Sequence, residues 1–214
     1  VDMGAYEDKS SLAACGHITS NTVWDANTIN INCNVHVDNG VKLTILPGTK
    51  VIANGSYRIY VKGNIVANGS PTDSIIFKSS NSAVGWKGIY LNNPSNSNDS
   101  SLFDYCRMEH YKLDTTYGGA LFAYSFDKVS VCNSTFKNNE NTNGRGAAMS
   151  IRSSDIEFKN NLCENNSAGY GAGLYVWSGD GIILNNRILN NSSKYNGGGM
   201  YVGYSESTIN NNII

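Results

Sequence analysis

Gly118-Gly119-Ala120-Leu121 is a phrase that this 214-residue chain repeats three more times. The later copies are Gly146-Ala147-Ala148-Met149, Gly171-Ala172-Gly173-Leu174 and Gly197-Gly198-Gly199-Met200. A second phrase lies between the copies and also recurs. It runs Val131-x-Asn133-x-x-Phe136-x-Asn138-Asn139 and returns from Phe158, from Ile183 and from Ile209, where the chain stops in mid-phrase. Two distinct phrases in each period indicate a solenoid built from stacked coils.

The period is measured between equivalent apolar positions of the second phrase. These are Phe136, Cys163, Ile188 and Ile214, separated by 27, 25 and 26 residues. Parallel strands stack like residues directly over one another, about 4.8 Å apart. Such stacking favours apolar columns inside, and side-chain amide ladders of the kind expected at Asn138, Asn165 and Asn190. Glycines suit the sharp corners, where φ is positive or backbones approach closely.

We therefore predict an all-β fold, a parallel β-helix that is right-handed by the crossover preference, with coils of about 25–28 residues in its C-terminal half. In the first half, short alternating segments such as Val35-His36-Val37, Ile59-Tyr60-Val61 and Ile89-Tyr90-Leu91 read as strands. The β-helix is expected over residues 21–214. Residues 1–20 are either an N-terminal extension or the end of a preceding module. Both chain ends read as cuts through a longer polypeptide.

The first half also carries a family resemblance, in V-x-V-x-x-G-V-x-L-T-I-x-P-G-T from Val35 and G-W-x-G-I-x-L from Gly85. It resembles the opening coils of bacterial right-handed β-helix repeat proteins. Gly118-Gly119-Ala120-Leu121 with Phe136-Lys137-Asn138-Asn139 is similar to the GGA[ILV] and FxxN repeats of chlamydial polymorphic membrane proteins. Related repeats occur in secreted adhesin-like bacterial proteins. The resemblance implies a fold and an extracellular or cell-surface location, and says little about chemistry.

Charge and apolar content limit the partners. The formal net charge is −1 and 15% of the residues are charged, so no basic face for nucleic acid is expected. No apolar run is long enough for this segment to insert into a membrane.

The five cysteines form no CxxC pair and predict no zinc site. Cys163 stands where other repeats carry Phe136 or Ile188, which indicates a buried apolar role. A Cys106–Cys132 disulfide stays open, although the repeat alignment places Ser134 opposite Cys106.

Parallel β-helices include pectate lyases and polygalacturonases, so catalysis is one hypothesis. The acids are scattered, and the nearest approach to a catalytic cluster is Asp104 and Glu109 around Arg107, which alternation allows to lie near one face. Such a group is more often a surface ion pair, so we assign no catalytic residue. His17, His36 and His110 occur singly and read as solvated or capping side chains. No cofactor or metal site is predicted, with Asn98-Asp99 as a candidate calcium contact.

The outer surface carries a stronger signal. If Leu121, Met149, Leu174 and Met200 point inward, their successors point outward. One outward column then contains Phe122, Tyr175 and Tyr201, continued by Tyr60 and Tyr90 in earlier coils. A second column two residues on contains Tyr124, Arg152 and Trp177. Exposed aromatic stripes commonly mark binding sites. Three interpretations remain: cross-strand stacking alone, worth about 0.2–1 kcal/mol per pair, contact with a glycan or another ligand, and packing against another protein.

The leading hypothesis is a non-enzymatic segment of a larger bacterial surface or secreted protein. It would act as an adhesin or stalk, beside other modules of the same polypeptide, and contact glycans or a host or neighbouring protein through the aromatic columns. The alternative is a polysaccharide-active lyase or hydrolase, or its carbohydrate-binding module. Self-association through the open coil ends is a third hypothesis.

Overall fold

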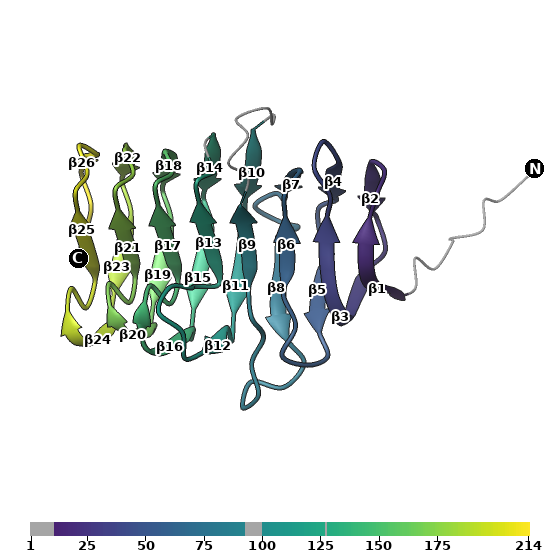
Figure 1. Ribbon diagram of the computed structural model, residues 1–214, viewed down its shortest axis with the longest axis horizontal. Coiled ribbons are helices and arrows are strands. Elements are labelled where there is room, and N and C mark those ends of the chain that lie inside the picture. The colour runs from purple at the N-terminus through teal and green to yellow at the C-terminus, as the bar shows by residue number, and fades with distance from the viewer. Residues whose placement is uncertain (1–10, 93–99, 127) are drawn as a thin grey trace, which may run out of the picture.

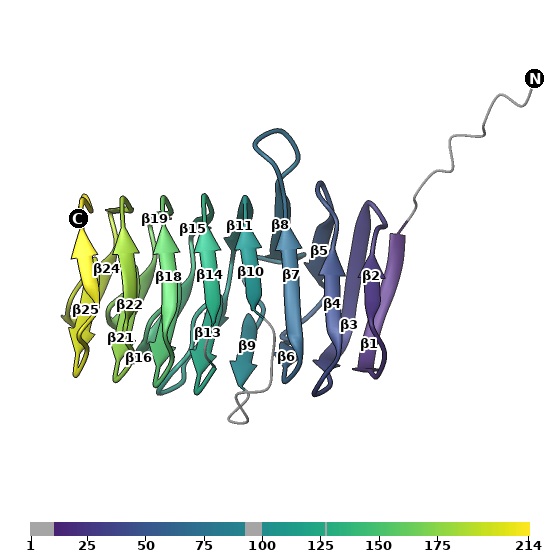
Figure 2. The same cartoon turned by 90° about the horizontal axis from the view of Figure 1, so that it is seen from above.

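The computed structural model describes residues 11–92, 100–126 and 128–214. These residues form parallel strands and no helix, which confirms the predicted parallel β-helix. Figure 1 shows the coils stacked along the longest axis, from β1 at one end to β25 and β26 at the other, and Figure 2 shows the same stack from above. The described part has no helix of the length and apolarity needed to span a bilayer.

Each complete coil contributes strands to three long faces. The aromatic face contains β6 (Ile59–Val61), β9 (Ile89–Asn92), β13 (Leu121–Tyr124), β17 (Met149–Arg152), β21 (Leu174–Trp177) and β25 (Met200–Gly203). The second face contains β2 (Thr22–Trp24), β4 (Lys42–Ile45), β7 (Asn64–Asn68), β10 (Ser101–Asp104), β14 (Val129–Cys132), β18 (Ile156–Lys159), β22 (Gly181–Leu184) and β26 (Thr208–Asn210). The third face contains β5 (Lys50–Ala53), β8 (Ile75–Ser79), β11 (Cys106–Glu109), β15 (Thr135–Lys137), β19 (Leu162–Glu164) and β23 (Arg187–Leu189).

The later coils add a short fourth face, while in the first coils one strand continues from the third face into the aromatic face. The short face contains β12 (Lys112–Leu113), β16 (Glu140–Arg145), β20 (Ser167–Tyr170) and β24 (Ser192–Asn196). The long strand β3 (Thr28–Val37) bends around a corner, so its start pairs with β5 and its end with β6. Strand β1 (Ser11–Ile18) pairs with β3 along both halves. Residues 11–18, which the sequence placed in an extension or a preceding module, are therefore paired with the stack.

The interior is a continuous apolar core. Alternation places one side chain of each pair inside, as in β18, where Ile156 and Phe158 are buried while Glu157 is exposed. Aromatic rings fill the centre, with Phe136 and Phe158 having centroids 6.0 Å apart. Burying a side chain of this size contributes roughly 1.5–3 kcal/mol. Cys163 lies in this core as predicted, and burial raises the pKa of its thiol.

The corners between faces use residues with positive φ, and most of these are not glycines. At the corner after the second face, Asn133, Asn160 and Asn185 have φ of 47°, 57° and 57°. Asparagine tolerates this left-handed conformation better than other residues with a Cβ atom. At the corner before the aromatic face, Gly146 and Gly171 have φ of 74° and 55°. The glycine-rich phrase is therefore turn geometry, as predicted.

An amide ladder is present, but the predicted residues do not form it. Asn138, Asn165 and Asn190 have φ of 56°, 55° and 54° and are exposed, so they make the corner itself. The next residue in each coil points inward and forms the ladder. The backbone N–H and the Nδ2 of Asn139 both donate to Oδ1 of Asn166, at 3.1 and 2.9 Å. Asn166 repeats both bonds to Asn191, at 2.9 Å each.

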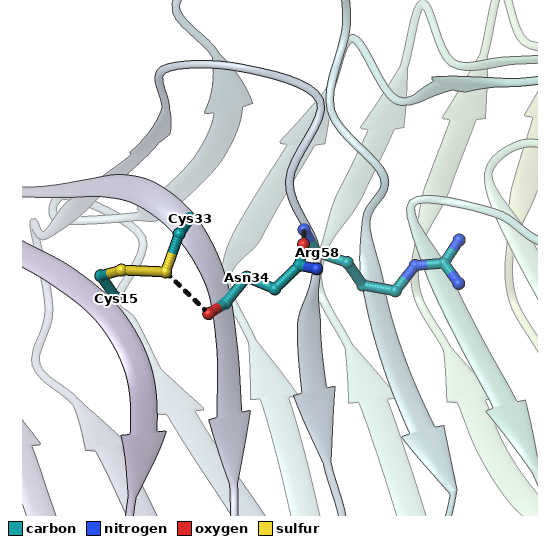
Figure 3. Close-up of a disulfide and its surroundings, with 4 residues drawn as sticks. All are labelled: Cys15, Cys33, Asn34 and Arg58. Carbon is teal, nitrogen blue, oxygen red and sulfur yellow. Dashed lines mark hydrogen bonds between the residues drawn. A yellow bond between two sulfur atoms is a disulfide. The ribbon is translucent and has the colours of Figure 1, made fainter.

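A disulfide joins Cys15 of β1 to Cys33 of β3, with Cα atoms 4.9 Å apart. The register shifts here, because Ala14 pairs with Ile31 and Gly16 with Val35. Figure 3 shows the bridge between the two ribbons, with Cys33 Sγ 3.2 Å from the carbonyl oxygen of Asn34. A disulfide sulfur has no proton, so this is a close contact and not a hydrogen bond. In chain-entropy terms a crosslink over 18 residues stabilises by about 3 kcal/mol, and it locks the first coil to the stack.

The other three cysteines are free, so the Cys106–Cys132 disulfide that the sequence left open is not formed. The backbone N–H of Cys106 donates instead to Oγ of Ser134 at 2.9 Å, which is the partner that the repeat alignment indicated.

Candidate ligand-binding face

The predicted aromatic column is a single in-register row on the aromatic face. Strand pairing aligns successive residues one coil apart, over the whole length of the stack. In order the row is His17, His36, Tyr60, Tyr90, Phe122, Ser150, Tyr175 and Tyr201. The second column is also in register, and aligns Asn92, Tyr124, Arg152, Trp177 and Gly203. The sequence therefore placed these side chains correctly, while their role in binding stays a prediction.

Neighbouring rings of the row are in contact. The centroids of Tyr90 and Phe122 lie 5.0 Å apart with the planes 12° from parallel. Those of Tyr175 and Tyr201 lie 5.3 Å apart, also at 12°. Stacked pairs of this kind stabilise by about 0.5–1.5 kcal/mol beyond their burial. Stacking therefore holds the rings in fixed orientations, so the face they present is preformed.

Ser150 is the one small residue in the row, and Tyr117 fills the space above it. Tyr117 precedes β13, and its ring centroid lies 6.5 Å from that of Phe122 and 6.3 Å from that of Tyr175. The segment is fixed by backbone bonds, since Arg145 N–H donates to Thr116 and Gly118 N–H donates to Arg145. Ser150 is fully buried and its Oγ has no hydrogen-bond partner among the described residues. Tyr117 thus completes the aromatic row from outside the strand.

Tyr117 covers part of the row, so the expected aromatic stripe is only partly exposed. Tyr175 is 2% exposed and Phe122 is 9% exposed, although both point outward. Burial raises the pKa of the Tyr175 hydroxyl to about 12, so it stays neutral at physiological pH. Tyr60, Tyr90, Tyr124, Trp177 and Tyr201 keep part of their surface open to solvent. Of the predicted residues of the two columns, these five have rings that a ligand can reach.

A hollow of about 320 Å³ lies at the C-terminal part of this face. Its lining residues are Tyr117, Arg145, Tyr170, Tyr175, Trp177, Asn196 and Tyr201. Tyr170 comes from β20 of the short face and stacks on Tyr195 with centroids 4.9 Å apart. A Cβ atom on Gly203 would lie 2.8 Å from the Trp177 ring, so glycine at this position leaves the space that the indole occupies. The hollow combines flat rings with hydroxyl, amide and guanidinium groups, a composition typical of ligand sites.

The opposite end of the row carries two histidines that are not isolated, contrary to the prediction. The rings of His17 and His36 stack with centroids 4.7 Å apart, and His36 stacks on Tyr60 at the same distance. His17 Nδ1 lies 2.8 Å from Asp38 Oδ1. Burial lowers the pKa of His36, and the charge of His17 lowers it further. His110, in contrast, occupies a corner with φ of 59°.

We predict from this stack that acid loosens the first coil. The folded-state pKa of His36 is below its ordinary value of 6.5, so folding favours the neutral ring. Stability is therefore intact above pH 6.5 and falls as the pH drops through the folded-state pKa. Amide exchange in β1 should accelerate between pH 7 and pH 5 after correction for intrinsic rates. His36→Gln should remove most of this change, and an equal acceleration in that variant would refute the assignment.

The predicted group of Asp104, Arg107 and Glu109 does not lie on one face. Arg107 and Glu109 lie on β11 of the third face and form an ion pair of 2.6 Å. Asp104 lies on β10 of the second face, where its Oδ1 accepts hydrogen bonds from Tyr105 N–H and from Asn133 Nδ2, at 3.1 and 2.8 Å. The expectation that the three share a face is therefore wrong. No three His, Cys, Asp or Glu side chains of the described residues are grouped as metal ligands, and Asn98-Asp99 lies outside those residues.

Sequence reasoning missed Tyr117, Arg145 and Tyr170, because they lie outside the strands whose alternation was followed. The short face follows no strict alternation. One signal was available: Tyr117, Arg145 and Tyr170 stand at matching positions, each directly before a glycine-rich phrase, and strand pairing aligns them.

The chain was compared with known proteins. A family model described as the pectate-lyase-like beta helix domain matches residues 16–125, which is just over half of the 214 residues. Neither the curated proteins nor the solved structures contain a significant match. The matched region covers the stack from β1 through β13 and agrees with the observed fold. This chain belongs to the family of pectate-lyase-like β-helix domains.

Proposed function

We propose that this chain is a glycan-binding β-helix segment of a larger bacterial protein at the cell surface or outside the cell. It has an adhesin or stalk role and performs no catalysis. The observation that carries the proposal is the hollow beside Trp177 and Tyr201 on a face of prestacked rings. Sugar rings stack on flat aromatic surfaces through their C–H faces, and the hydroxyl and amide groups beside the rings can bond sugar hydroxyls.

Three further features support the proposal. The resemblance of the repeats to those of chlamydial polymorphic membrane proteins and adhesin-like bacterial proteins favours a surface role. The Cys15–Cys33 disulfide suits an oxidising, extracellular compartment. A solenoid whose coils contact only their neighbours is a natural spacer between modules of one polypeptide.

The alternative is a polysaccharide lyase or hydrolase, or its binding module. The family itself favours this reading, since its description refers to pectate lyase. Against a lyase-type site stands the separation of Asp104 from the Arg107–Glu109 pair. Incubation with a polysaccharide panel, followed by assays for reducing ends and for unsaturated products, decides between the two. Turnover by the purified chain would replace the proposal by the alternative.

Binding is tested on a glycan array, followed by calorimetry with the best ligand. Trp177→Ala and Tyr201→Ala should each weaken binding about tenfold, because each removes an accessible ring from the hollow. Ile182→Ala is the matched control, since Ile182 is 37% exposed on β22 of the second face. Equal affinity for all four proteins would refute the aromatic face as the binding surface. Loss of affinity in the control alone would place the site on the second face.

A further inference from the structure

Two arginines beside the aromatic row, Arg152 of β17 and Arg145 of β16, lie against aromatic rings. The Cζ atom of Arg152 lies 4.4 Å from the centroid of the Tyr117 ring, and that of Arg145 lies 4.9 Å from it. Arg152 also faces Tyr124 at 5.3 Å, and Arg145 faces Tyr170 at 5.5 Å. Both guanidinium groups are thus held against aromatic rings by cation–π contacts. Within the described part of the chain, neither has a carboxylate in ion-pair distance.

Four cations on the other faces are paired with carboxylates. Arg107 pairs with Glu109, Lys137 with Glu164 and Lys159 with Glu157, at 2.6, 2.8 and 2.9 Å. A fourth pair, Lys112 with Glu140, has a distance of 3.2 Å. Because the whole chain has a net charge of −1, acids are not scarce. Arg145 and Arg152 differ from these four cations, because aromatic rings and not carboxylates hold their guanidinium groups.

Arg145 stands between two hollows. It lines the aromatic hollow of about 320 Å³ and also a polar one of about 570 Å³, and Tyr170 lines both. The polar hollow contains one acid, Asp114. Asp114 Oδ1 accepts the backbone N–H of Asn143 at 3.2 Å, and its Oδ2 accepts Asn143 Nδ2 at 3.0 Å. Asn143 holds both oxygens of this acid by hydrogen bonds, and among the described residues Asp114 forms no ion pair with Arg145.

We infer that the ligand of this face carries an anionic group, a carboxylate or a sulfate ester, which binds to Arg145 and Arg152 while a neighbouring sugar ring stacks on Trp177 or Tyr201. This inference rests on the proposed glycan-binding function and names the chemical class of the glycan. Residues Tyr117 and Ser150 act as positioning residues, because the small Ser150 leaves the space for the ring that holds both arginines.

The physical reason lies in the geometry of the guanidinium group. An aromatic ring covers one flat side of it and leaves the N–H edge free for hydrogen bonding. Carboxylate and sulfate oxygens match this edge and can accept two parallel hydrogen bonds. The rings also restrict the side chains before binding, so less conformational entropy is lost when an anion arrives.

The test uses three polymers with one backbone: dextran, carboxymethyl-dextran and dextran sulfate. The wild-type chain should bind both charged polymers at least tenfold more tightly than dextran. The difference should shrink as NaCl rises from about 50 to 500 mM, since salt screens exposed charges. The carboxymethyl and sulfate arms show which anion the site prefers.

Arg145→Gln and Arg152→Gln should each weaken binding of the charged polymers about fivefold to tenfold. Arg187→Gln is the matched control, because Arg187 is exposed on β23 of the third face and the variant loses the same unit charge. Arg145→Lys keeps the charge without the planar edge and should recover only part of the affinity. Thermal unfolding of every variant shows that it is folded.

The outcomes separate the two claims. Equal binding of charged and neutral polymers overturns the anionic inference and leaves glycan binding intact. An effect of Arg187→Gln as large as that of Arg145→Gln also overturns it, because the attraction is then non-specific. The glycan-binding proposal itself fails if no glycan of the array binds. The assignment of the site to the aromatic face fails if Trp177→Ala and Tyr201→Ala leave the affinity unchanged.

Discussion

Replacing Asn166 by leucine is expected to lower the free energy of unfolding by about 4 kcal/mol, a large fraction of the stability of a protein of this size. Asn166 is buried, and its Oδ1 accepts both the N–H and the Nδ2 of Asn139. Its Nδ2 donates to the carbonyl oxygen of Phe136 at 3.0 Å. Leucine has a similar volume but satisfies none of these groups. The Asn139 N–H and the Phe136 carbonyl oxygen would therefore lose these bonds inside the stack, and Asn139 Nδ2 would keep only its bond to the carbonyl oxygen of Met108.

The neighbouring residue supplies the matched control. Asn165 is exposed and has φ of 55°, a conformation that glycine adopts freely. Asn165→Gly should change stability by no more than about 1 kcal/mol. Urea unfolding followed by circular dichroism measures both variants, and amide exchange at Asn139 reports the ladder directly. If Asn166→Leu costs less than about 1 kcal/mol while the Asn139 amide stays protected, the ladder contributes little.

The two asparagines also show where sequence reasoning succeeds and where it fails. The repeat of Asn-Asn predicts a corner with an amide ladder, because stacked coils bring like residues together. It does not indicate which asparagine turns the corner, since either is compatible with positive φ. The structure decides it through burial: the first asparagine faces solvent, and the second satisfies backbone groups that would otherwise be orphaned.

The aromatic row was predictable for a related reason. Period-two alternation and the coil repeat together fix which side chains point outward and which are neighbours. Exposure was not predictable, because it depends on what covers the strand. Tyr117 stands directly before the first glycine-rich phrase, in register with Arg145 and Tyr170, but strand alternation does not indicate that its ring covers Ser150. Long-range placement of this kind depends on tertiary packing and not on a local pattern.

Neither the coil repeat nor the strand alternation predicted the disulfide. Cys15 and Cys33 lie in the first coils, before the repeats become regular, and a register shift between β1 and β3 brings them together. The pair that the sequence left open was Cys106 and Cys132, which lie about one coil apart, although the repeat alignment places Ser134 opposite Cys106. Among the described strands β1 pairs only with β3, so the crosslink reinforces that single pairing.

Tyr175→Ala is expected to lower the free energy of unfolding by about 3 kcal/mol, near the lower limit for truncating a buried aromatic side chain. The Tyr175 ring stacks on that of Tyr201 at 5.3 Å and on that of Trp177 at 6.5 Å, and it meets that of Tyr117 edge-on at 6.3 Å. Its removal leaves a cavity at the centre of the row. Tyr201→Ala should cost less than about 1 kcal/mol, because Tyr201 already has part of its surface in water.

These two variants separate structural support from ligand contact. Tyr201→Ala should remain nearly as stable as the wild type and lose glycan affinity, whereas Tyr175→Ala should lose stability first. Tyr175→Phe keeps the ring and should preserve both properties, since the neutral hydroxyl contributes little to stacking. Thermal unfolding combined with calorimetry on the folded variants measures each effect. If Tyr175→Ala is as stable as the wild type and yet no longer binds, Tyr175 is itself a ligand contact, and the row is built for binding along its whole length rather than at its accessible rings.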